Sequence, residues 1–259
     1  MTPEQLAAVG LQFSVEGPVA TITLDRPQVR NAQTPAMWEA LASLGDAVPR
    51  DVRVVVVTGV GATFSAGLDR SVLDPTNPEG VGALLQATDD AAADRIGAWQ
   101  EGFTWLRDPR FVSIAKVRGY AVGAGFQLAL SCDLRVVSDD AQFCMKESAL
   151  GLVPDLTGTK PLVESVGYAR ALEICATARM VSAEEAVRIG LATSMHAGDE
   201  LDEAVATLAA TLASPMDGVV SETKSLLQGA EDRDLDAQRQ LEREAQVRRF
   251  RAVAAALGG

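Results

Sequence analysis

The glycine-rich segment from Gly119 to Asp133 constrains the fold of this chain more than any other. It follows an apolar run, Phe111 to Val117, that reads as a buried strand, and it leads into another, Leu134 to Val137. Three glycines precede apolar positions at helical spacing, which predicts a strand, a tight turn and a helix. The bare first turn of that helix offers unpaired backbone N–H groups to an anion or a developing oxyanion, although close packing of a helix on a sheet would also need glycine.

A second glycine-rich loop also follows a predicted strand. The run from Val52 to Thr58 is apolar enough for burial on both faces, as in a parallel sheet, and the loop from Gly59 to Asp69 comes next. It lacks the Gly-Lys-Ser/Thr of a Walker motif and opens no helix with a strict G-x-G-x-x-G. Two such units predict an α/β fold that binds its ligand at the carboxyl ends of the parallel strands.

The other elements follow from local patterns. Two alternating runs around Gly17-Pro18 predict a β-hairpin, and Thr34 before Pro35 predicts the start of a helix. The final helix is highly charged with a thin apolar stripe, as in a helix that packs on a neighbouring domain or subunit. The predicted ranges are 11–16 and 19–24 for the hairpin, 35–47 for the helix, 71–80 for a mobile surface loop, 81–107 for a long helix and 235–257 for the final helix.

Composition bounds the class of protein. The chain has 259 residues, enough for one large domain or a domain with an extension, and no apolar run approaches the ~20 residues of a membrane helix. The N-terminal sequence MTPEQLAAVG has no signal pattern, so we expect a cytoplasmic protein. A net charge of −12 argues against nucleic acid or an anionic membrane as a partner.

Cysteine and histidine usage bears on metal and redox chemistry. Cys132, Cys144 and Cys175 have neither paired nor metal-like spacing, which predicts buried free thiols. His196 is the only histidine, so a histidine-rich metal site is excluded and no metal is expected. No nucleophile elbow accompanies Ser194, and His196 reads as a surface or strand-end residue.

Five blocks in order make the chain resemble the crotonase family, the enoyl-CoA hydratase/isomerase superfamily. The blocks are residues 26–32, 64–69, 119–133, 141–151 and 182–191. The resemblance implies an α/β spiral of ββα repeats over residues 1–196, which holds the CoA and thioester site. It also implies a C-terminal helical oligomerisation region over residues 197–259 that builds a homotrimer, or a hexamer as a dimer of trimers.

The resemblance also implies an oxyanion hole and a CoA site. Two backbone N–H groups, those of Leu68 and Ala124, would stabilise the enolate of a thioester. Coenzyme A would enter as part of the substrate, with no separate cofactor. Arg26 and Arg70 are candidate phosphate partners, although each is also an ordinary solvated arginine. The CoA-binding residues implied by position are Arg26, Val29, Arg30, Ala66, Asp69 and Arg70.

The acid/base residues separate the reactions within this family. Hydratases use two glutamates to activate water, and the position of the first is Gln127 here, while the second corresponds to Glu147. An amide cannot take a proton from water at neutral pH, so Gln127 either orients a water or ligand or is simply a helix residue near the pocket. Glu147 alone suffices to shift a double bond, unless it is a surface glutamate at a helix start.

Asp155 is a candidate second carboxylate. The segment from Lys146 to Asp155 resembles that of Δ3,5-Δ2,4-dienoyl-CoA isomerases, which carry a Glu and, eight residues later, an Asp. Those enzymes also have an Asp where this chain has Gln127. Asp155 is alternatively the N-cap of a helix.

The resemblance therefore predicts an acyl-CoA enzyme that isomerises an enoyl- or dienoyl-CoA through an oxyanion-stabilised enolate. An enoyl-CoA hydratase in which Glu147 works alone is the first alternative. A non-catalytic acyl-CoA-binding protein that keeps the fold is the second.

Overall fold

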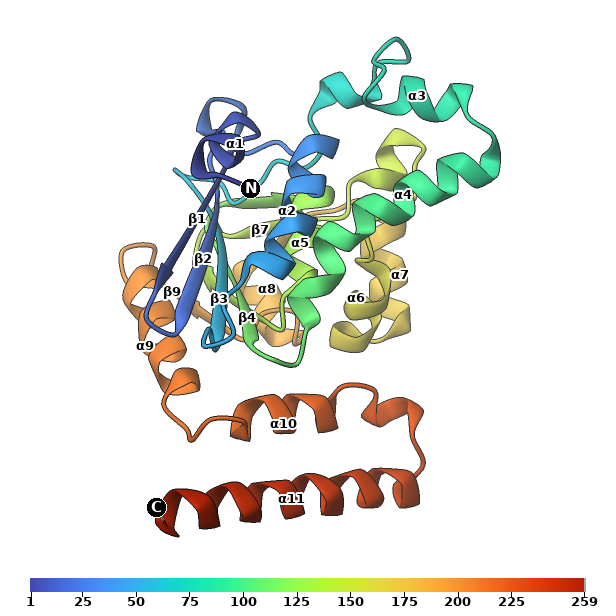
Figure 1. Cartoon of the computed structure of the whole chain (residues 1–259). Coiled ribbons are helices and arrows are strands. Elements are labelled where there is room, and N and C mark those ends of the chain that lie inside the picture. The colour runs from blue at the N-terminus through green and yellow to red at the C-terminus, as the bar shows by residue number, and fades with distance from the viewer. Residues whose placement is uncertain (259) are drawn as a thin grey trace.

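The computed structural model describes residues 1–258 and shows a six-stranded sheet, a smaller three-stranded sheet and helices around both (Figure 1). The large sheet has the order β1-β2-β3-β4-β6-β9, antiparallel between β1 and β2 and parallel elsewhere. The small sheet has the order β5-β7-β8. The strands are β1 (Leu11–Glu16), β2 (Val19–Leu24), β3 (Val54–Gly59), β4 (Val112–Val117), β5 (Tyr120–Val122), β6 (Leu134–Ser138), β7 (Gln142–Cys144), β8 (Val181–Ser182) and β9 (Ser194–His196).

Eleven α-helices lie in the described part of the chain, with short 3₁₀ turns between some of them. The helices are α1 (Pro3–Ala8), α2 (Pro35–Ala47), α3 (Val81–Gln86), α4 (Asp89–Thr104), α5 (Ala124–Ser131), α6 (Thr159–Val166), α7 (Tyr168–Thr177), α8 (Ala183–Arg188), α9 (Leu201–Ala213), α10 (Val219–Leu227) and α11 (Leu235–Gly258). No helix within residues 1–258 has the length and apolar character needed to cross a membrane.

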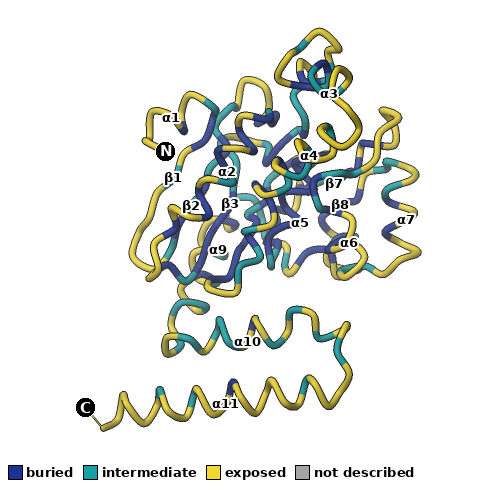
Figure 2. The backbone as a smooth tube through the Cα atoms, turned by 45° about the vertical axis from the view of Figure 1, so that its right-hand side comes forward, coloured by how far each residue is buried: buried dark blue, intermediate teal, exposed yellow. Residues whose placement is uncertain are grey.

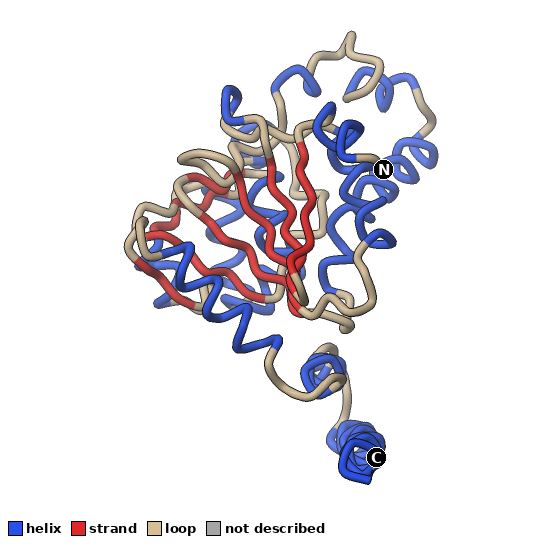
Figure 3. Tube along the Cα trace, turned by 60° about the vertical axis from the view of Figure 1, so that its left-hand side comes forward, coloured by secondary structure: helices blue, strands red, loops and turns tan. Residues whose placement is uncertain are grey.

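The centre of the large sheet is buried on both faces, as the apolar run in β3 predicts. Val55 and Val57 belong to the core formed with α2 and α4. Val54 and Val56 face the other way and pack with residues of α9. In Figure 3, α9 is the helix that crosses in front of the strands and leads on to the C-terminal helices. Alternation of side chains along a strand divides the four valines between two helix layers.

The hairpin and the first long helix agree with the sequence prediction, and the α/β class is confirmed. Leu11 pairs with Leu24 at one end of the hairpin. Thr34 caps α2 by accepting a hydrogen bond from the Met37 N–H at 3.3 Å.

The prediction of one long helix over residues 81–107 is wrong. The chain leaves α3 after Gln86, and α4 starts again at the second residue beyond Ala87. Thr88 caps α4 by accepting from the Ala91 N–H at 3.3 Å, and two aspartates follow it in the first turn. A capping threonine and acidic residues favour a new helix start, which explains the break. The predicted loop over residues 71–80 likewise begins inside a 3₁₀ turn, Arg70–Leu73.

The glycine-rich segment is more elaborate than a strand, a turn and a helix, because it contributes β5 to the small sheet before α5 begins. Gly119 and Gly123 have φ of +57° and +51°, a region that favours glycine. At Gly125 an added Cβ would lie 2.6 Å from the Ser65 carbonyl oxygen. The glycines therefore shape the turn and permit close packing, while the use of the helix start as an oxyanion site stays a prediction.

The last two helices stand apart from the rest of the molecule (Figures 1 and 2). On α11 only Ala245 is buried. On α10 the buried residue is Lys224, whose ammonium group reaches the core. Whether the chain divides functionally near residue 197 stays a prediction, although α9, beyond that boundary, packs on the sheet.

Candidate active site

The two glycine-rich loops meet at the carboxyl ends of β3 and β4. Ser65 donates its N–H to Tyr120 O at 2.9 Å and accepts from Val122 N–H at 3.0 Å, in the manner of a short parallel ladder. Two residues further along, Gly67 lies against the start of α5. A Cβ built on Gly67 would be 2.5 Å from the Val122 oxygen and 3.6 Å from the Ala124 nitrogen. Leu68 and Ala124, 56 residues apart, therefore belong to one site.

Pairing with Gln33 sets the direction of the Leu68 amide. The N–H of Gln33 donates to Gly67 O at 2.7 Å, and the N–H of Asp69 donates to Gln33 O at 2.8 Å. Because successive amides of an extended chain point to opposite sides, the Leu68 N–H points away from Gln33. Ala124 is the first residue of α5, so its N–H has no acceptor within the helix. The direction of the Leu68 amide and the place of Ala124 at the helix start fit the predicted oxyanion role, which stays a prediction.

The polar network beneath the glycine-rich loop over residues 59–69 was not predicted from the sequence. The Ser65 hydroxyl donates to Asn31 O at 2.7 Å and accepts from the Gln33 side chain at 3.1 Å and from Gly67 N–H at 3.2 Å. Gln33 also accepts from the Trp38 indole at 2.8 Å. These polar side chains are buried, and a fully satisfied buried network holds a loop rigidly. The sequence signals them only in that Asn31 and Ser65 fall within the family-like blocks.

Glu147 lies at the start of a 3₁₀ turn that follows β7 (Glu147–Leu150). It is 8% exposed, and a Cβ built on Gly123 would be 3.4 Å from its Oε1, so the carboxylate adjoins the start of α5. Oε1 accepts from the Gln127 Nε2 at 2.7 Å. Oε2 is buried and has no hydrogen-bond partner within residues 1–258. The interpretation of Glu147 as a surface glutamate is therefore wrong.

Burial raises the pKa of Glu147, and the nearby charge of Asp155 raises it further. The main-chain N–H of Glu147 itself and, after it, the hydrogen bond from Gln127 oppose both effects, because each favours the ionised form. A carboxylate with a raised pKa and a free oxygen is suited to take up and release a proton.

Gln127 is enclosed by its partners. It is 1% exposed, and its Oε1 accepts from the Leu156 N–H at 2.8 Å and the Gly158 N–H at 3.3 Å, while Nε2 bonds Glu147. The structure therefore places Gln127 behind Glu147, with its amide engaged by protein groups.

Asp155 lies on the loop held by Gln127. Its main-chain oxygen accepts from the Gln100 side chain of α4 at 2.6 Å, and burial raises the pKa of its carboxyl group. The N-cap alternative is wrong, because α6 begins at Thr159 and Gly158 occupies its N-cap position with no side-chain cap. Glu147 and Asp155 are thus near enough to influence each other electrostatically.

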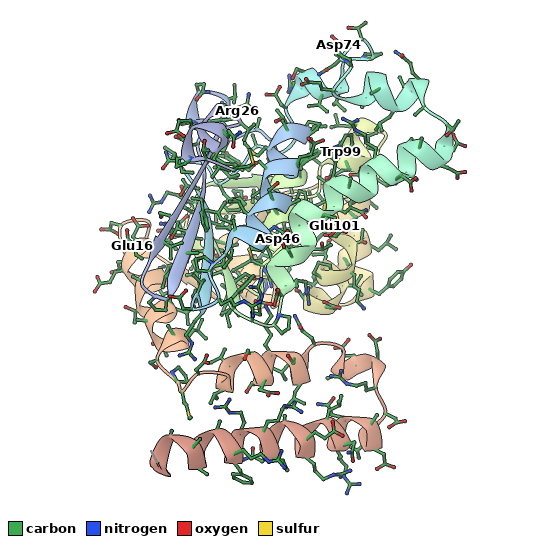
Figure 4. The ribbon with its side chains drawn as sticks, in the orientation of Figure 1. Glu16, Arg26, Asp46, Asp74, Trp99 and Glu101 are labelled. Atoms are coloured by element: carbon green, nitrogen blue, oxygen red, sulfur yellow. The ribbon has the colours of Figure 1, made fainter. Side chains whose placement is uncertain are left out.

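Arg26 and Asp69 pair with each other rather than standing free. Arg26 Nη1 lies 3.0 Å from Asp69 Oδ2 and 2.6 Å from Ala32 O. In Figure 4, Arg26 lies beyond the end of β2, beside α1. The pair joins the loop after the hairpin to the glycine-rich loop over residues 59–69. The charge of Arg26 therefore already has a counter-ion within the chain.

The remaining predicted CoA contacts lie on the same two loops as Arg26 and Asp69. The Ala66 N–H donates to Arg30 O at 2.8 Å, which joins the two loops a second time. Val29, Arg30 and Arg70 are exposed there. The structure thus gathers these residues around one edge of the site, and their contact with CoA stays a prediction.

The three cysteines are unpaired, and two of them, Cys144 and Cys175, lie close to Glu147. Cys132 and Cys144 are buried, Cys175 is half-buried and all three are free, while burial raises the pKa of Cys132 to about 12. His196 ends β9 and its ring bonds the Ser194 hydroxyl at 3.0 Å. Within residues 1–258 no three His, Cys, Asp or Glu side chains gather as a metal site would require.

Comparison with known proteins gives consistent matches. Residues 14–254 match the model of the enoyl-CoA hydratase/isomerase family. A probable enoyl-CoA hydratase of Mycobacterium leprae is 33% identical over 196 residues, which cover 75% of this chain and 71% of the relative. A peroxisomal Δ(3,5)-Δ(2,4)-dienoyl-CoA isomerase of Arabidopsis thaliana is 31% identical over 227 residues, covering 87% and 74%.

The solved structures include a protein with higher identity. The crystal structure of a putative enoyl-CoA hydratase from Thermobifida fusca YX in complex with acetoacetyl-CoA superposes with a TM-score of 0.93. It is 50% identical, and the match covers 97% of this chain and 98% of that one.

Proposed function

Because the chain belongs to the enoyl-CoA hydratase/isomerase family and acts on an acyl-CoA, we propose that it shifts a carbon–carbon double bond of an enoyl- or dienoyl-CoA. The observation that carries the proposal is how the two carboxylate oxygens of Glu147 are bonded and buried. One carboxylate oxygen is held by an amide, and the other is buried, unpaired within residues 1–258 and beside the start of α5. The site therefore contains one base at this position and not the pair of glutamates that activates water.

The reaction follows from this geometry. Glu147 Oε2 takes a proton from C2 of a 3-enoyl thioester, and the electrons of that C–H bond form the C1–C2 double bond of a dienolate. The negative charge on the thioester oxygen is stabilised by the N–H groups of Leu68 and Ala124, the latter at a helix start. Glu147 then returns the proton to C4, which leaves the double bond between C2 and C3 and regenerates the carboxylate.

Asp155 extends this reaction to a conjugated substrate. With a 3,5-dienoyl thioester the proton must be delivered at C6, further from the thioester than Glu147 serves. Asp155, on the adjoining loop and with a pKa raised by burial, is the proposed donor. It gives its proton to C6 while Glu147 holds the proton taken from C2, and proton exchange with solvent then returns both groups to their starting states. The similarity to the Arabidopsis isomerase supports this form of the reaction.

Hydration of a 2-enoyl-CoA is the second candidate. The relatives from Mycobacterium leprae and Thermobifida fusca carry hydratase names. In that case Glu147 alone would take a proton from water and return it to C2, and the Gln127 amide could not share the work.

An assay of the purified protein with 2-enoyl-, 3-enoyl- and 3,5-dienoyl-CoA separates these reactions. We expect the double-bond shift to be faster than hydration, and Glu147→Gln to lower kcat by about 10²–10⁴. Asp155→Asn should slow the dienoyl reaction selectively. Glu101→Gln, an exposed glutamate on α4 labelled in Figure 4, is the matched control.

Three outcomes would contradict the proposal. Rapid hydration of the 2-enoyl-CoA with no double-bond shift would favour the hydratase. Full activity of Glu147→Gln would remove its role as the base. Saturable acyl-CoA binding with no turnover would indicate a binding protein.

A further inference from the structure

We infer that Gln127 is a positioning residue that selects Oε2 of Glu147 as the proton-carrying atom and fixes the loop of Asp155 against the same carboxylate. The inference rests on the proposed function in one respect, the role of Glu147 as the base. Sequence comparison alone marks this position only as the missing first glutamate of the hydratase pair.

The orientation of the Gln127 amide is determined by its neighbours. Its Oε1 faces two main-chain N–H groups, from Leu156 at 2.8 Å and Gly158 at 3.3 Å. Main-chain N–H groups only donate, so the atom that faces them must be the amide oxygen. The amide nitrogen is therefore the atom directed at Glu147, 2.7 Å from Oε1.

A fixed donor at Oε1 determines where Glu147 carries its proton. The Gln127 Nε2 has hydrogens to donate and cannot accept, so Oε1 must remain an acceptor whether the carboxyl group is neutral or ionised. A proton taken by Glu147 then resides on Oε2, the oxygen with no partner in the described chain. Both reacting states keep the same side-chain rotamer, so no reorientation is needed between proton uptake and release.

The same side chain holds the second carboxylate in place. The two N–H groups bound to Gln127 belong to the chain directly after Asp155. Contact is also tight at Gly158, where an added Cβ would lie 2.7 Å from the Gln127 Cγ. Gln127 stands one turn after Ala124 on α5, so the oxyanion donor, the base and the Asp155 loop share one short helix as their frame.

Three other titratable groups adjoin Glu147 and bear on any measurement there. Asp155 is on the loop after the Glu147–Leu150 turn, Cys144 ends β7 and Cys175 lies on α7. Burial raises the pKa of both thiols, so they stay neutral in the range where a carboxyl group titrates.

The test is a pH titration of the Glu147 side-chain carboxyl carbon by NMR, with ¹³C-labelled glutamate. The signal is assigned by its loss in Glu147→Gln. In Gln127→Met we expect the midpoint to rise by about one pH unit, because the ionised form loses a hydrogen-bond donor. Gln228→Met is the matched control. It removes a hydrogen bond of 2.6 Å that the Gln228 side-chain amide donates to Arg107 O, far from the site, and it should leave the midpoint of Glu147 unchanged.

Gln127→Glu provides a second variant if methionine does not fold at this position. The new carboxyl group would then face that of Glu147, in place of the present hydrogen bond from Gln127 Nε2 to Glu147 Oε1. Two carboxyl groups at this distance are not ionised at the same time. We expect two coupled midpoints separated by more than about one pH unit. Two independent midpoints near the ordinary glutamate value would overturn the inference, as would an unchanged midpoint in folded Gln127→Met.

The titration requires no substrate, so it is independent of which reaction the protein catalyses. A protein that hydrates 2-enoyl-CoA but shows the expected midpoints would retain the inference and lose the proposed isomerisation. Acid-limb shifts of kcat/KM that follow the NMR midpoints would connect the two, since a purely structural role of Gln127 would lower stability without moving a pH profile.

Discussion

Glu147 occupies surroundings that favour its neutral form, although the proposed reaction needs it ionised. Burial and the neighbouring Asp155 raise its pKa, while Gln127 restrains the rise. A carboxylate whose pKa is near the ordinary glutamate value of about 4.3 is a weak base and would take a proton from carbon poorly. A raised pKa therefore serves the reaction.

The pH dependence of activity follows from the direction of this shift. Glu147 must be deprotonated to act, so kcat/KM should fall as the pH falls through its raised pKa, above about 4.3. A pH series of kcat/KM with a 3-enoyl-CoA measures this limb. A limb at or below the ordinary glutamate value would contradict the assignment.

Stability should respond in the opposite sense to activity. With a raised pKa the native state binds more protons than the unfolded state between the two pKa values, so this group lowers the free energy of unfolding as the pH rises through that window. Glu147→Gln should therefore be more stable than the wild type at pH 7 and equal to it at a pH below both values. Urea unfolding at the two pH values provides the comparison.

Arg70 offers a test of the proposed CoA site. It is exposed on the rim, whereas Arg26 is already paired with Asp69. If Arg70 contacts a phosphate of CoA, Arg70→Ala should raise KM about 1.5-fold to fivefold, the size of an exposed ion pair. A thioester of pantetheine, which lacks those phosphates, should show no change. Equal effects on both substrates would place Arg70 elsewhere.

At the level of elements, the proposed function depends on how closely the glycine-rich loop over residues 59–69 approaches the start of α5. Gly67 has φ of +91°, and its missing side chain leaves room beside Val122 O and Ala124 N. The two proposed oxyanion donors can converge only because no Cβ separates them. The helix start and the loop thus form one functional unit.

Gly67→Ala should lower kcat by about 10²–10³, the usual cost of losing one oxyanion donor. Gly61→Ala is the matched control, since it has φ of +83° but its Cβ would meet only Pro27, at 3.7 Å. It should cost about 1 kcal/mol of stability and leave kcat nearly unchanged. Steady-state kinetics and urea unfolding of both variants distinguish the effects. Similar loss of kcat in both would attribute it to general strain.

The elements that the sequence predicted well are those with strong local signals. The hairpin alternates apolar and polar residues around Gly17-Pro18, and Thr34-Pro35 starts α2 by side-chain capping. The prediction of one long helix failed because it did not take account of the capping signal at Thr88, which is equally local. The short β5 strand has no such signal, since it exists by pairing with β7 and with the chain at Ser65, both distant in sequence.

At the scale of the whole molecule, one buried lysine connects α10 to the chain that follows α5, the helix of the candidate site. Lys224 Nζ donates to Asp108 O and Phe111 O, each at 2.8 Å, and to Asp133 Oδ2 at 2.7 Å. Asp133 follows the carboxyl end of α5 and also accepts from the Ser113 N–H. The position of α10 is thus linked to the frame of the site.

Lys224→Met should lower the free energy of unfolding by about 3 kcal/mol or more, because it leaves the partly buried Asp133 without its cation. Lys160→Met is the control, since Lys160 is 73% exposed and its pair with Glu164 contributes at most about 1 kcal/mol. Urea unfolding at one protein concentration provides both values. Equal losses would mean that the buried pair has no special weight.

The outer face of α11 supports a proposed oligomer. Val247, Phe250, Val253 and Leu257 are exposed at helical spacing, with Phe250 64% exposed in the single chain. We propose that another copy of the chain covers this stripe, in agreement with the predicted trimer or hexamer. Phe250→Asp should then shift the mass measured by light scattering toward the monomer, with Arg239→Asp as a surface control. A monomeric wild type would contradict the proposal.

The sequence by itself determined the family, the α/β class and the identities of the proposed reacting groups. Buried valine runs, capping residues and glycine loops act over a few neighbouring positions, so local physics specifies them. The presence of Gln127 at the position of the first hydratase glutamate is also visible in the sequence, and it limits the chemistry because an amide is not a base at neutral pH.

Only the tertiary structure decided how those groups are engaged. Arg26 is neutralised by Asp69, 43 residues away, and Oε2 of Glu147 is left as the unpaired oxygen of the described chain by Gln127, 20 residues away. Such contacts depend on which surfaces the folded chain brings together, not on local propensity. Burial likewise sets the pKa of Glu147, because desolvation is a property of the packed site and not of the residue.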